Sequence, residues 1–379
     1  MIYADHAATT PLSIAAREAM RPYIEDEYGN PSTLYSLAAT ARKAIRSARE
    51  QIAAVIGAQP EEIIFTSGGT ESDNLAIKGT AFRYPGMRKH IITSAIEHHA
   101  VLHSCEFLRY MGHDVEILPV DKTGMVSPQM LYDRVKSNTI LTTIMMANNE
   151  IGTIEPIHDL AEAAHNHGIL FHTDAVQAVG HIPVNVNELG IDMLSASGHK
   201  FNGPKGVGFL YIRRDTPIQP LLTGGGQEMG IRSGTENVAA IVGMAAALME
   251  HTNNLTTETE RLTNLCSKLI DELSKSGLDF IVNGSTNRIP GSLSLSFKGV
   301  SGEMLLHRLD LMGICVATGS ACNSKDTVLS HVIRAIEVDP IYAYGTIRIT
   351  MGNDNDIEQV RIMAESIAKV VKQTKRMSN

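Results

Sequence analysis

The chain has 379 residues, of which 43% are hydrophobic and 20% are charged, enough to bury the cores of roughly two or three globular domains. Its formal net charge of −8 argues against a general nucleic-acid binder, because such proteins usually carry a basic face. A polar start, no apolar run of bilayer length and four cysteines without Cys-x-x-Cys spacing predict a cytoplasmic protein with reduced thiols, no membrane span and no structural zinc site.

Between about residues 60 and 215, short apolar runs alternate with amphipathic segments. The apolar runs predict strands at 63–65, 91–93, 115–120, 140–146, 169–172, 193–196 and 207–212. The amphipathic segments predict helices at 70–83, 100–111, 128–136 and 157–167. Strands that alternate with helices indicate an α/β fold, in which a mostly parallel sheet is covered on both faces.

After about residue 240 the pattern changes, and leucines at helical spacing between 262 and 273 predict a long helix. The remaining segments predict strands at 293–297, 314–317 and 347–350, and helices at 303–311 and 357–372. These elements predict a smaller α+β domain. We expect residues 15–240 to form a large domain, and residues 1–14 and 241–379 to form a small C-terminal domain.

A lysine, Lys200, ends the segment of small residues at 195–200, directly after a predicted strand. A lysine at a strand end can face a cleft. An enzyme that uses pyridoxal phosphate (PLP) needs one such lysine to hold the cofactor covalently and to move protons. Taken alone, an ordinary surface lysine is the commoner explanation, and Lys205 in the neighbouring Gly/Pro turn is a rival.

Four further segments also follow predicted strands. Asp174 follows an apolar run that ought to be buried, and its carboxylate needs either a protonated ring nitrogen or a helix N-terminus as partner. The Gly-Gly turn at 68–69 exposes backbone N–H groups at a helix N-terminus, which suits a phosphate. The imidazole of His98 can stack on a planar ring, and the amide of Asn149 can hold a ring substituent or a carboxylate.

All these segments lie just beyond the C-terminal ends of predicted parallel strands, where ligands of open α/β sheets bind. Each one is ambiguous alone, since glycine-rich turns and single histidines are common without a ligand. In this order, however, a phosphate cup, an imidazole, an aspartate and a lysine indicate a PLP site.

The four cysteines differ in their neighbours. Cys105, Cys266 and Cys315 lie in apolar or helical patterns that are typical of small buried side chains. Only Cys322 has small and polar neighbours, in Gly-Ser-Ala-Cys-Asn-Ser. It is therefore the candidate for an exposed nucleophilic thiol.

Eight short motifs resemble, in family order, those of the NifS/IscS cysteine desulfurases. They are DHAATT (5–10), GNPS (29–32), GTES (69–72), EH (97–98), NNEIG (148–152), SGHK (197–200), RSGT (232–235) and GSAC (319–322). The resemblance spans nearly the whole chain. It implies the PLP-dependent transferase fold of type I, with a large domain on a mostly parallel sheet and a smaller α+β domain that carries the catalytic cysteine loop.

The resemblance also implies roles for individual residues. Lys200 would hold PLP and act as acid and base, and His98 would stack on the ring and relay protons. Cys322 would take the sulfur. The other expected cofactor contacts are Gly69, Thr70, Asn149, Asp174, Gln177, Ser197 and His199, together with Thr235 of the neighbouring subunit in a homodimer. The expected substrate contacts are Asn30, Asn149 and Arg348.

The activity implied by the resemblance is conversion of L-cysteine to L-alanine, with the sulfur left on Cys322 as a persulfide. A NifU/IscU-like scaffold or a thiolation enzyme would accept the sulfur, with no direct nucleic-acid or membrane contact. No intrinsic metal is expected, although Cys322 is a candidate transient Fe–S ligand. Two alternatives stay open. A selenocysteine lyase would use a similar site on a selenium substrate, and a class V aminotransferase would share the fold and Lys200 but has no need of Cys322. A non-enzymatic module would lack the lysine or the aspartate, and this chain has both.

Overall fold

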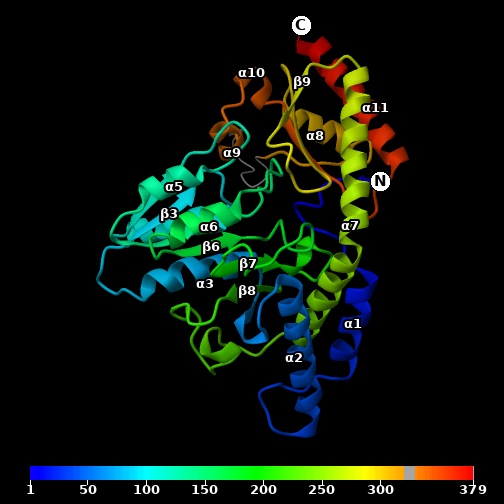
Figure 1. The fold of residues 1–379 in the computed structure, drawn as a ribbon. Helices are drawn as coiled ribbons and strands as arrows, with labels where there is room; N and C mark the ends of the chain where they lie inside the picture. The colour runs from blue at the N-terminus through cyan, green and yellow to red at the C-terminus, as the bar shows by residue number, and fades with distance from the viewer. Residues whose placement is uncertain (320–328, 379) are drawn as a thin grey trace.

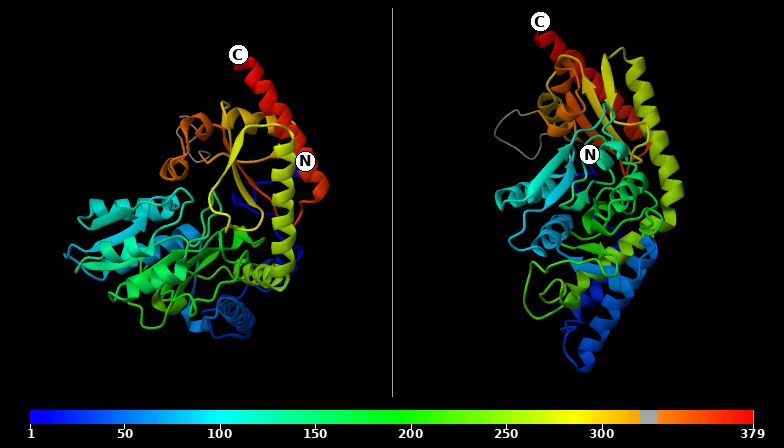
Figure 2. Two further views of the ribbon diagram at one scale, coloured as in Figure 1. Left: turned by 45° about the horizontal axis from the view of Figure 1, so that its top comes forward. Right: turned by 60° about the vertical axis from the view of Figure 1, so that its left-hand side comes forward.

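The computed structural model describes residues 1–319 and 329–378, which form two regions joined by one long helix (Figure 1). The larger region is built on a seven-stranded sheet and the smaller one on a three-stranded sheet. The long helix, α7 (Val238–Lys275), runs along both regions, and α11 (Ile357–Ser378) lies beside its second half (Figure 2).

The strands of the larger sheet lie in the order β2-β8-β7-β6-β5-β3-β4. Their bounds are β2 (Ile63–Thr66), β3 (His90–Ser94), β4 (Asp114–Leu118), β5 (Thr139–Thr143), β6 (Leu170–Asp174), β7 (Met193–Ser197) and β8 (Gly208–Ile212). Every neighbouring pair is parallel except the two that include β8. The expected mostly parallel α/β sheet is therefore confirmed.

The direction of β8 follows from its short connection to β7. Only residues 198–207 separate the two strands. A parallel pair needs a crossover of about a dozen residues or more, so this connection permits only an antiparallel return.

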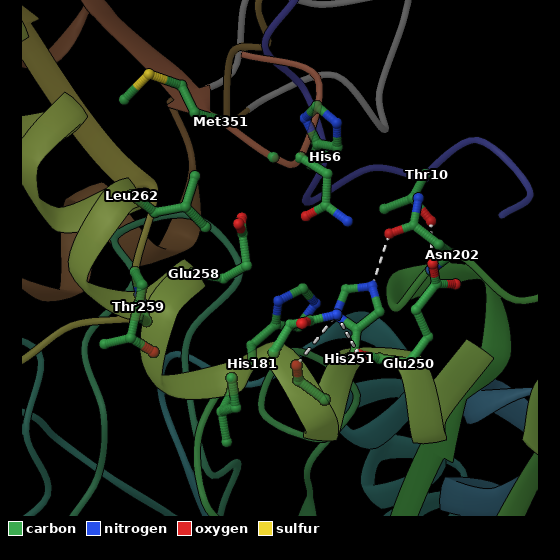
Figure 3. Close-up of a pocket in the computed structure, with 16 residues that line it drawn as sticks. His6, Thr10, His181, Asn202, Glu250, His251, Glu258, Thr259, Leu262 and Met351 are labelled. Atoms are coloured by element: carbon green, nitrogen blue, oxygen red, sulfur yellow. Dashed lines mark hydrogen bonds between the residues drawn. The ribbon is translucent and has the colours of Figure 1, made fainter. Parts of the chain in front are cut away.

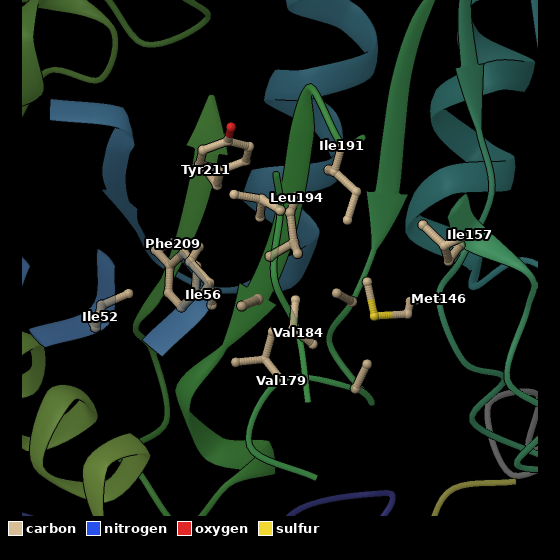
Figure 4. Close-up of a cluster of buried hydrophobic side chains, with 14 of the residues drawn as sticks. Ile52, Ile56, Met146, Ile157, Val179, Val184, Ile191, Leu194, Phe209 and Tyr211 are labelled. Atoms are coloured by element: carbon tan, nitrogen blue, oxygen red, sulfur yellow. The ribbon is translucent and has the colours of Figure 1, made fainter. Parts of the chain in front are cut away.

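Helices cover both faces of the sheet, as the alternation along β8 shows. Phe209 and Tyr211 belong to a core shared with α2 (Ser36–Ile56) and α6 (Ile157–His165), part of which is drawn in Figure 4. Leu210 points to the opposite face. That second core is covered by α3 (Gly69–Phe82) and α4 (His99–Tyr110), and α5 (Pro128–Arg134) packs on α6.

The smaller region has its own core. Its antiparallel strands lie in the order β12-β10-β9, with bounds β9 (Phe280–Asn283), β10 (Ser292–Phe297) and β12 (Thr346–Thr350). The other elements are β1 (Ile2–Tyr3), α8 (Gly302–Asp310), β11 (Ile314–Cys315), α9 (His331–Ala335) and α10 (Pro340–Ala343). Leucines of α7 pack here against β10, β12 and α11.

The structure differs from the expected elements near the N-terminus and at residues 314–317. The structure adds α1 (Ile14–Glu25) and α2, which pack on the first half of α7. The expected strand at 314–317 is only β11, because the segment changes partner. Cys315 pairs with β1, whereas Ala317 bridges to Arg348 of β12.

The boundary expected between residues 240 and 241 lies inside α7, which crosses it without interruption. Met244 and Leu248 pack in the core of the larger region, whereas Leu265 and Leu269 pack in that of the smaller region. The division into 15–240 and 1–14 with 241–379 stays a prediction. Within the described residues, no helix has the length and apolar character needed to cross a membrane.

Candidate active site

A cavity of about 490 Å³ lies where the two regions meet, and polar side chains from both regions line it. Ten of the residues expected from the sequence line this cavity: Gly69, Thr70, His98, Asn149, Asp174, Gln177, Ser197, His199, Lys200 and Arg348. Segments far apart in the chain therefore converge as the motif order predicts.

The sheet explains this convergence. The parallel strands β3, β5, β6 and β7 all end at the same edge, and ligands of open α/β sheets bind there. Asp174 is the last residue of β6 and Ser197 the last of β7. Lys200 ends the short 3₁₀ turn that follows β7.

The amine of Lys200 is held by the N-terminal segment. Its Nζ donates to the carbonyl oxygens of Ala7 at 2.6 Å and Ala8 at 3.0 Å. The amide of Gln177 also donates to the Ala7 oxygen, at 3.0 Å. The rival lysine, Lys205, is exposed and does not line the cavity.

Two buried carboxylates form the floor of the cavity. Asp174 accepts a hydrogen bond from the Val176 N–H at 2.9 Å. Burial raises the pKa of Asp174, while the charges of His98 and Lys200 lower it. Asp73 is also buried, and its pKa is raised well above the usual range by burial and by the charge of Asp174. A cationic group above these carboxylates would be strongly stabilised.

The glycine turn before α3 allows a close backbone approach. Gly68 has φ 148°, a conformation that L side chains rarely adopt. A Cβ on Gly69 would come within 2.5 Å of Val176 Cγ2, so this turn packs against the segment that carries Asp174. The first N–H groups of α3 therefore stand at the cavity, where a helix N-terminus favours an anion.

Two histidines flank this turn and the lysine. His98 is the N-cap of α4, and its Nδ1 accepts from the Ala100 N–H at 3.2 Å, which fixes the orientation of the ring. His199 lies 3.1 Å from the Thr9 hydroxyl. Burial and the charges of Lys200 and Lys205 lower the pKa of His199 to about 4, so its imidazole is neutral near pH 7.

The opposite wall carries Arg348 of β12. Its Nη1 donates to the backbone oxygen of Asn149 at 2.9 Å, and its Nη2 donates to Asp5 Oδ1 at 2.7 Å. Its buried Nε has no hydrogen-bond acceptor among the described residues. Each terminal nitrogen carries two N–H donors, so a guanidinium at the cavity wall is suited to an anionic ligand.

Three expected residues are not part of the cavity as described. Thr235 and Asn30 are exposed outside it, and the Asn30 side chain accepts from the Ser32 N–H. The expected role of Thr235 is at the site of a neighbouring subunit, and it stays a prediction. Cys322 lies outside the described residues, although Gly319 lines the cavity.

Several lining residues were missed by the sequence analysis. They are Asp5, Asp73, Glu97, Glu150 and His331. A signal existed for four of them. Asp73 lies four residues after Gly69, on the same face of α3. Asp5, Glu97 and Glu150 lie in the family-like motifs at 5–10, 97–98 and 148–152.

A second, smaller cavity of about 160 Å³ is lined by His6, His181 and His251 (Figure 3). His251 bonds Asn202 at 2.7 Å, and His181 bonds the backbone oxygen of Lys200 at 2.9 Å. His181 thus connects the lining of this cavity to the turn that carries Lys200. None of the residues expected for the PLP site lines it.

Comparisons with known proteins agree with this arrangement. Residues 2–363 match the family described as aminotransferase class-V. The chain is 50% identical to "Cysteine desulfurase IscS" of Dictyoglomus turgidum, over 100% of this chain and 96% of that protein. It is 47% identical to the protein of the same name from Methanosarcina thermophila, over 100% and 93%.

Solved structures of similar proteins superpose on this chain. A "NifS-like protein" superposes with a TM-score of 0.92 and 38% identity, covering 98% of this chain and 99% of that one. The structure titled "SspA in complex with cysteine" superposes with a TM-score of 0.83 and 37% identity, covering 93% and 99%.

Proposed function

Since the chain belongs to the class V aminotransferase family, we propose that it is a PLP-dependent cysteine desulfurase, which converts L-cysteine to L-alanine and leaves the sulfur on Cys322. The observation that carries this proposal is the single cavity in which Lys200, the Asp73–Asp174 floor and Arg348 meet. It is supported by relatives named cysteine desulfurase, of which the match covers 93–96% of the length.

The residues of the cavity fit PLP. The buried floor suits a protonated ring nitrogen, with Asp174 as its partner and Gln177 beside the ring hydroxyl. Gly69, Thr70, Ser197 and His199 would hold the phosphate at the α3 N-terminus. When bound, PLP supplies an electron sink that makes the substrate Cα proton acidic.

Lys200 has two tasks in this proposal: its Nζ holds the cofactor and later moves the Cα proton. The Ala7 and Ala8 carbonyl oxygens keep this amine at the cavity. His98, held at its N-cap position on α4, would stack on the ring.

Arg348 and Asn149 grip the substrate carboxylate, with Asn30 as a further contact. A guanidinium suits this task because its planar fork matches a carboxylate. The position of Arg348 and Asn149 together in the cavity lining supports the assignment.

The sulfur step belongs to Cys322. Its thiolate attacks the substrate sulfur and the C–S bond breaks; the bonding electrons return toward the substrate carbon skeleton, which is protonated to alanine. An ordinary cysteine is mostly protonated near pH 7, so a proton must first be removed, and His98 is the candidate acceptor. Cys105 and Cys266 suit this task less well, because burial raises the pKa of each thiol to about 12.

The persulfide then passes to an acceptor, either a NifU/IscU-like scaffold or a thiolation enzyme. In this proposal the enzyme is a cytoplasmic homodimer, and Thr235 of each subunit reaches the phosphate in the other. Cys322 is the only proposed Fe–S ligand, and a transient one.

The test is to incubate the purified protein with L-cysteine and no keto acid. We expect alanine, and a mass increase of one sulfur atom on the peptide that contains Cys322. Alanine formed only with a keto acid would instead indicate an aminotransferase. Turnover of selenocysteine but not cysteine would indicate a selenocysteine lyase.

A further inference from the structure

Asp5 and Arg348 form an ion pair across 343 positions of the chain, with 2.7 Å between Oδ1 and Nη2. Both side chains are largely buried, and both line the cavity. Arg348 is proposed to bind the substrate carboxylate, yet it already contacts the carboxylate of Asp5.

The backbone determines where Asp5 lies. Residues 4–7 run alongside Thr350 at the end of β12. The Thr350 N–H donates to the Ala4 oxygen at 2.8 Å, and the His6 N–H donates to the Thr350 oxygen at 3.1 Å. The Tyr3 hydroxyl donates to the Asp5 backbone oxygen at 3.0 Å. The Asp5 carboxylate is thus held in position before any ligand arrives.

Asp5 and the Asn149 backbone oxygen together orient the guanidinium. Each accepts from a different terminal nitrogen of Arg348, so rotation of the plane would break one of the two bonds. The Nε–H is left buried without an acceptor among the described residues. With the plane held in this way, the further N–H donors of the two terminal nitrogens have a fixed direction for a ligand carboxylate in the cavity.

We propose that Asp5 is a positioning residue for carboxylate recognition, which acts through Arg348 and does not touch the reacting atoms. The proposal rests on the cysteine desulfurase function proposed above, because it takes an α-amino acid as the ligand. The same N-terminal segment also holds Lys200 through the Ala7 oxygen, so it aligns the carboxylate clamp with the amine.

The opposite effect of Asp5 is physically possible and makes the proposal testable. The aspartate neutralises part of the arginine charge, and a substrate carboxylate would meet a second negative charge nearby. If this repulsion dominated, removing Asp5 would strengthen ligand binding. If orientation dominates, as we propose, removing Asp5 weakens it.

The experiment compares holoenzyme variants Asp5→Ala and Asp5→Asn with wild type. The ligands are L-alanine and L-alaninamide, which differ only in the charge and donor pattern at the carboxyl group. Binding is followed by the absorbance change of the cofactor. Asp354→Asn is the matched control, because Asp354 is an exposed carboxylate that follows β12 and does not line the cavity.

We expect Asp5→Ala to weaken L-alanine binding by about tenfold or more, the loss of one charge-assisted hydrogen bond. Asp5→Asn should be intermediate, because its amide oxygen can still accept from Arg348. L-alaninamide should change by less than about threefold, and the control should change neither ligand. In an Arg348→Lys background, Asp5→Ala should add little.

Three results would overturn the proposal. Tighter L-alanine binding in both variants would show that Asp5 competes with the ligand. Equal weakening of both ligands, with a lower melting temperature, would show a structural role alone. If Asp5→Ala fails to fold, Asp5→Asn decides, since unchanged L-alanine binding in that variant is also contradictory. If the wild type fails to make alanine from cysteine, the proposed function is refuted. The effect of Asp5 on the binding of L-alanine relative to L-alaninamide is a separate result and would still stand.

Discussion

Asp73 and Asp174 place carboxyl oxygens within 4.8 Å of each other on the cavity floor, and a His98 nitrogen lies within the same distance of both. Burial raises the pKa of both acids. The charges of His98 and Lys200 favour the anion of Asp174, whereas the charge of Asp174 acts against ionisation of Asp73. We infer that Asp73 carries the proton and Asp174 the charge.

This division predicts unequal effects of two isosteric changes. Asp174→Asn removes the charge that partners the ring nitrogen and should lower alanine production by about a hundredfold. Asp73→Asn replaces a neutral carboxyl with a neutral amide and should cost less than about tenfold. Initial rates at saturating PLP decide the matter, and equal losses would contradict the assignment.

Substitution of the different cysteines should have different effects on the reaction. Cys322→Ser should keep PLP and bind L-cysteine, yet its alanine production should fall by about a hundredfold or more. Cys105→Ser and Cys266→Ser should still form the persulfide, with melting temperatures lower by about 2–4 °C because a hydroxyl replaces a buried thiol. Single-turnover assays and mass spectrometry of these variants are the measurement. Near wild-type alanine production by Cys322→Ser would exclude the desulfurase reaction.

Borohydride reduction should attach the cofactor to Lys200, because its amine stands in the cavity. Lys205 is a matched control, five residues away and exposed. Peptide mapping should find the modified residue at 200 and an unmodified one at 205. If the cofactor mapped to Lys205, the assignment of Lys200 as the lysine that holds it would be wrong.

Thr235 should act across subunits. Lys200→Ala and Thr235→Ala homodimers should each be impaired, while mixed dimers regain one intact site, built from Lys200 of one chain and Thr235 of the other. Activity of purified heterodimers, made with two affinity tags, provides the readout. Activity no higher than that of the two parent homodimers would mean that Thr235 acts within its own subunit or not at all.

A buried glutamate outside the cavity should limit stability at high pH. Burial raises the pKa of Glu155 to about 8, although its carboxylate accepts from the Val126 N–H. The folded state therefore binds more protons than the unfolded state between pH about 4.3 and 8, and stability falls as pH rises through this window.

Glu155→Gln removes that titration. The variant should melt close to wild type at pH 5 and several degrees higher at pH 8.5, about 2–4 °C for each kcal/mol relieved. Thermal unfolding across this pH range is the measurement, and Glu106→Gln, at an exposed position, is the control. A pH-independent difference would show that the carboxyl does not titrate in this window.

Much of the fold and of the candidate site could be predicted from local pattern. The apolar run before Asp174 and the Gly-Gly turn before α3 each place a polar group at a strand end. Parallel strands share one edge, so such groups converge wherever their strands pair. The other expected site residues came from the order of the family-like motifs. Ten of the expected residues line one cavity.

Tertiary structure alone decided which distant groups meet. The ion pair of Asp5 and Arg348 depends on backbone pairing between the first residues and the end of β12, and no local period encodes that pairing. The burial of Asp73 likewise depends on α3 packing against the sheet beside β6. Sequence patterns report which side chains are buried and how the local chain bends. Which buried groups become neighbours is settled by packing across the whole chain, where desolvation and charge then decide each group's ionisation.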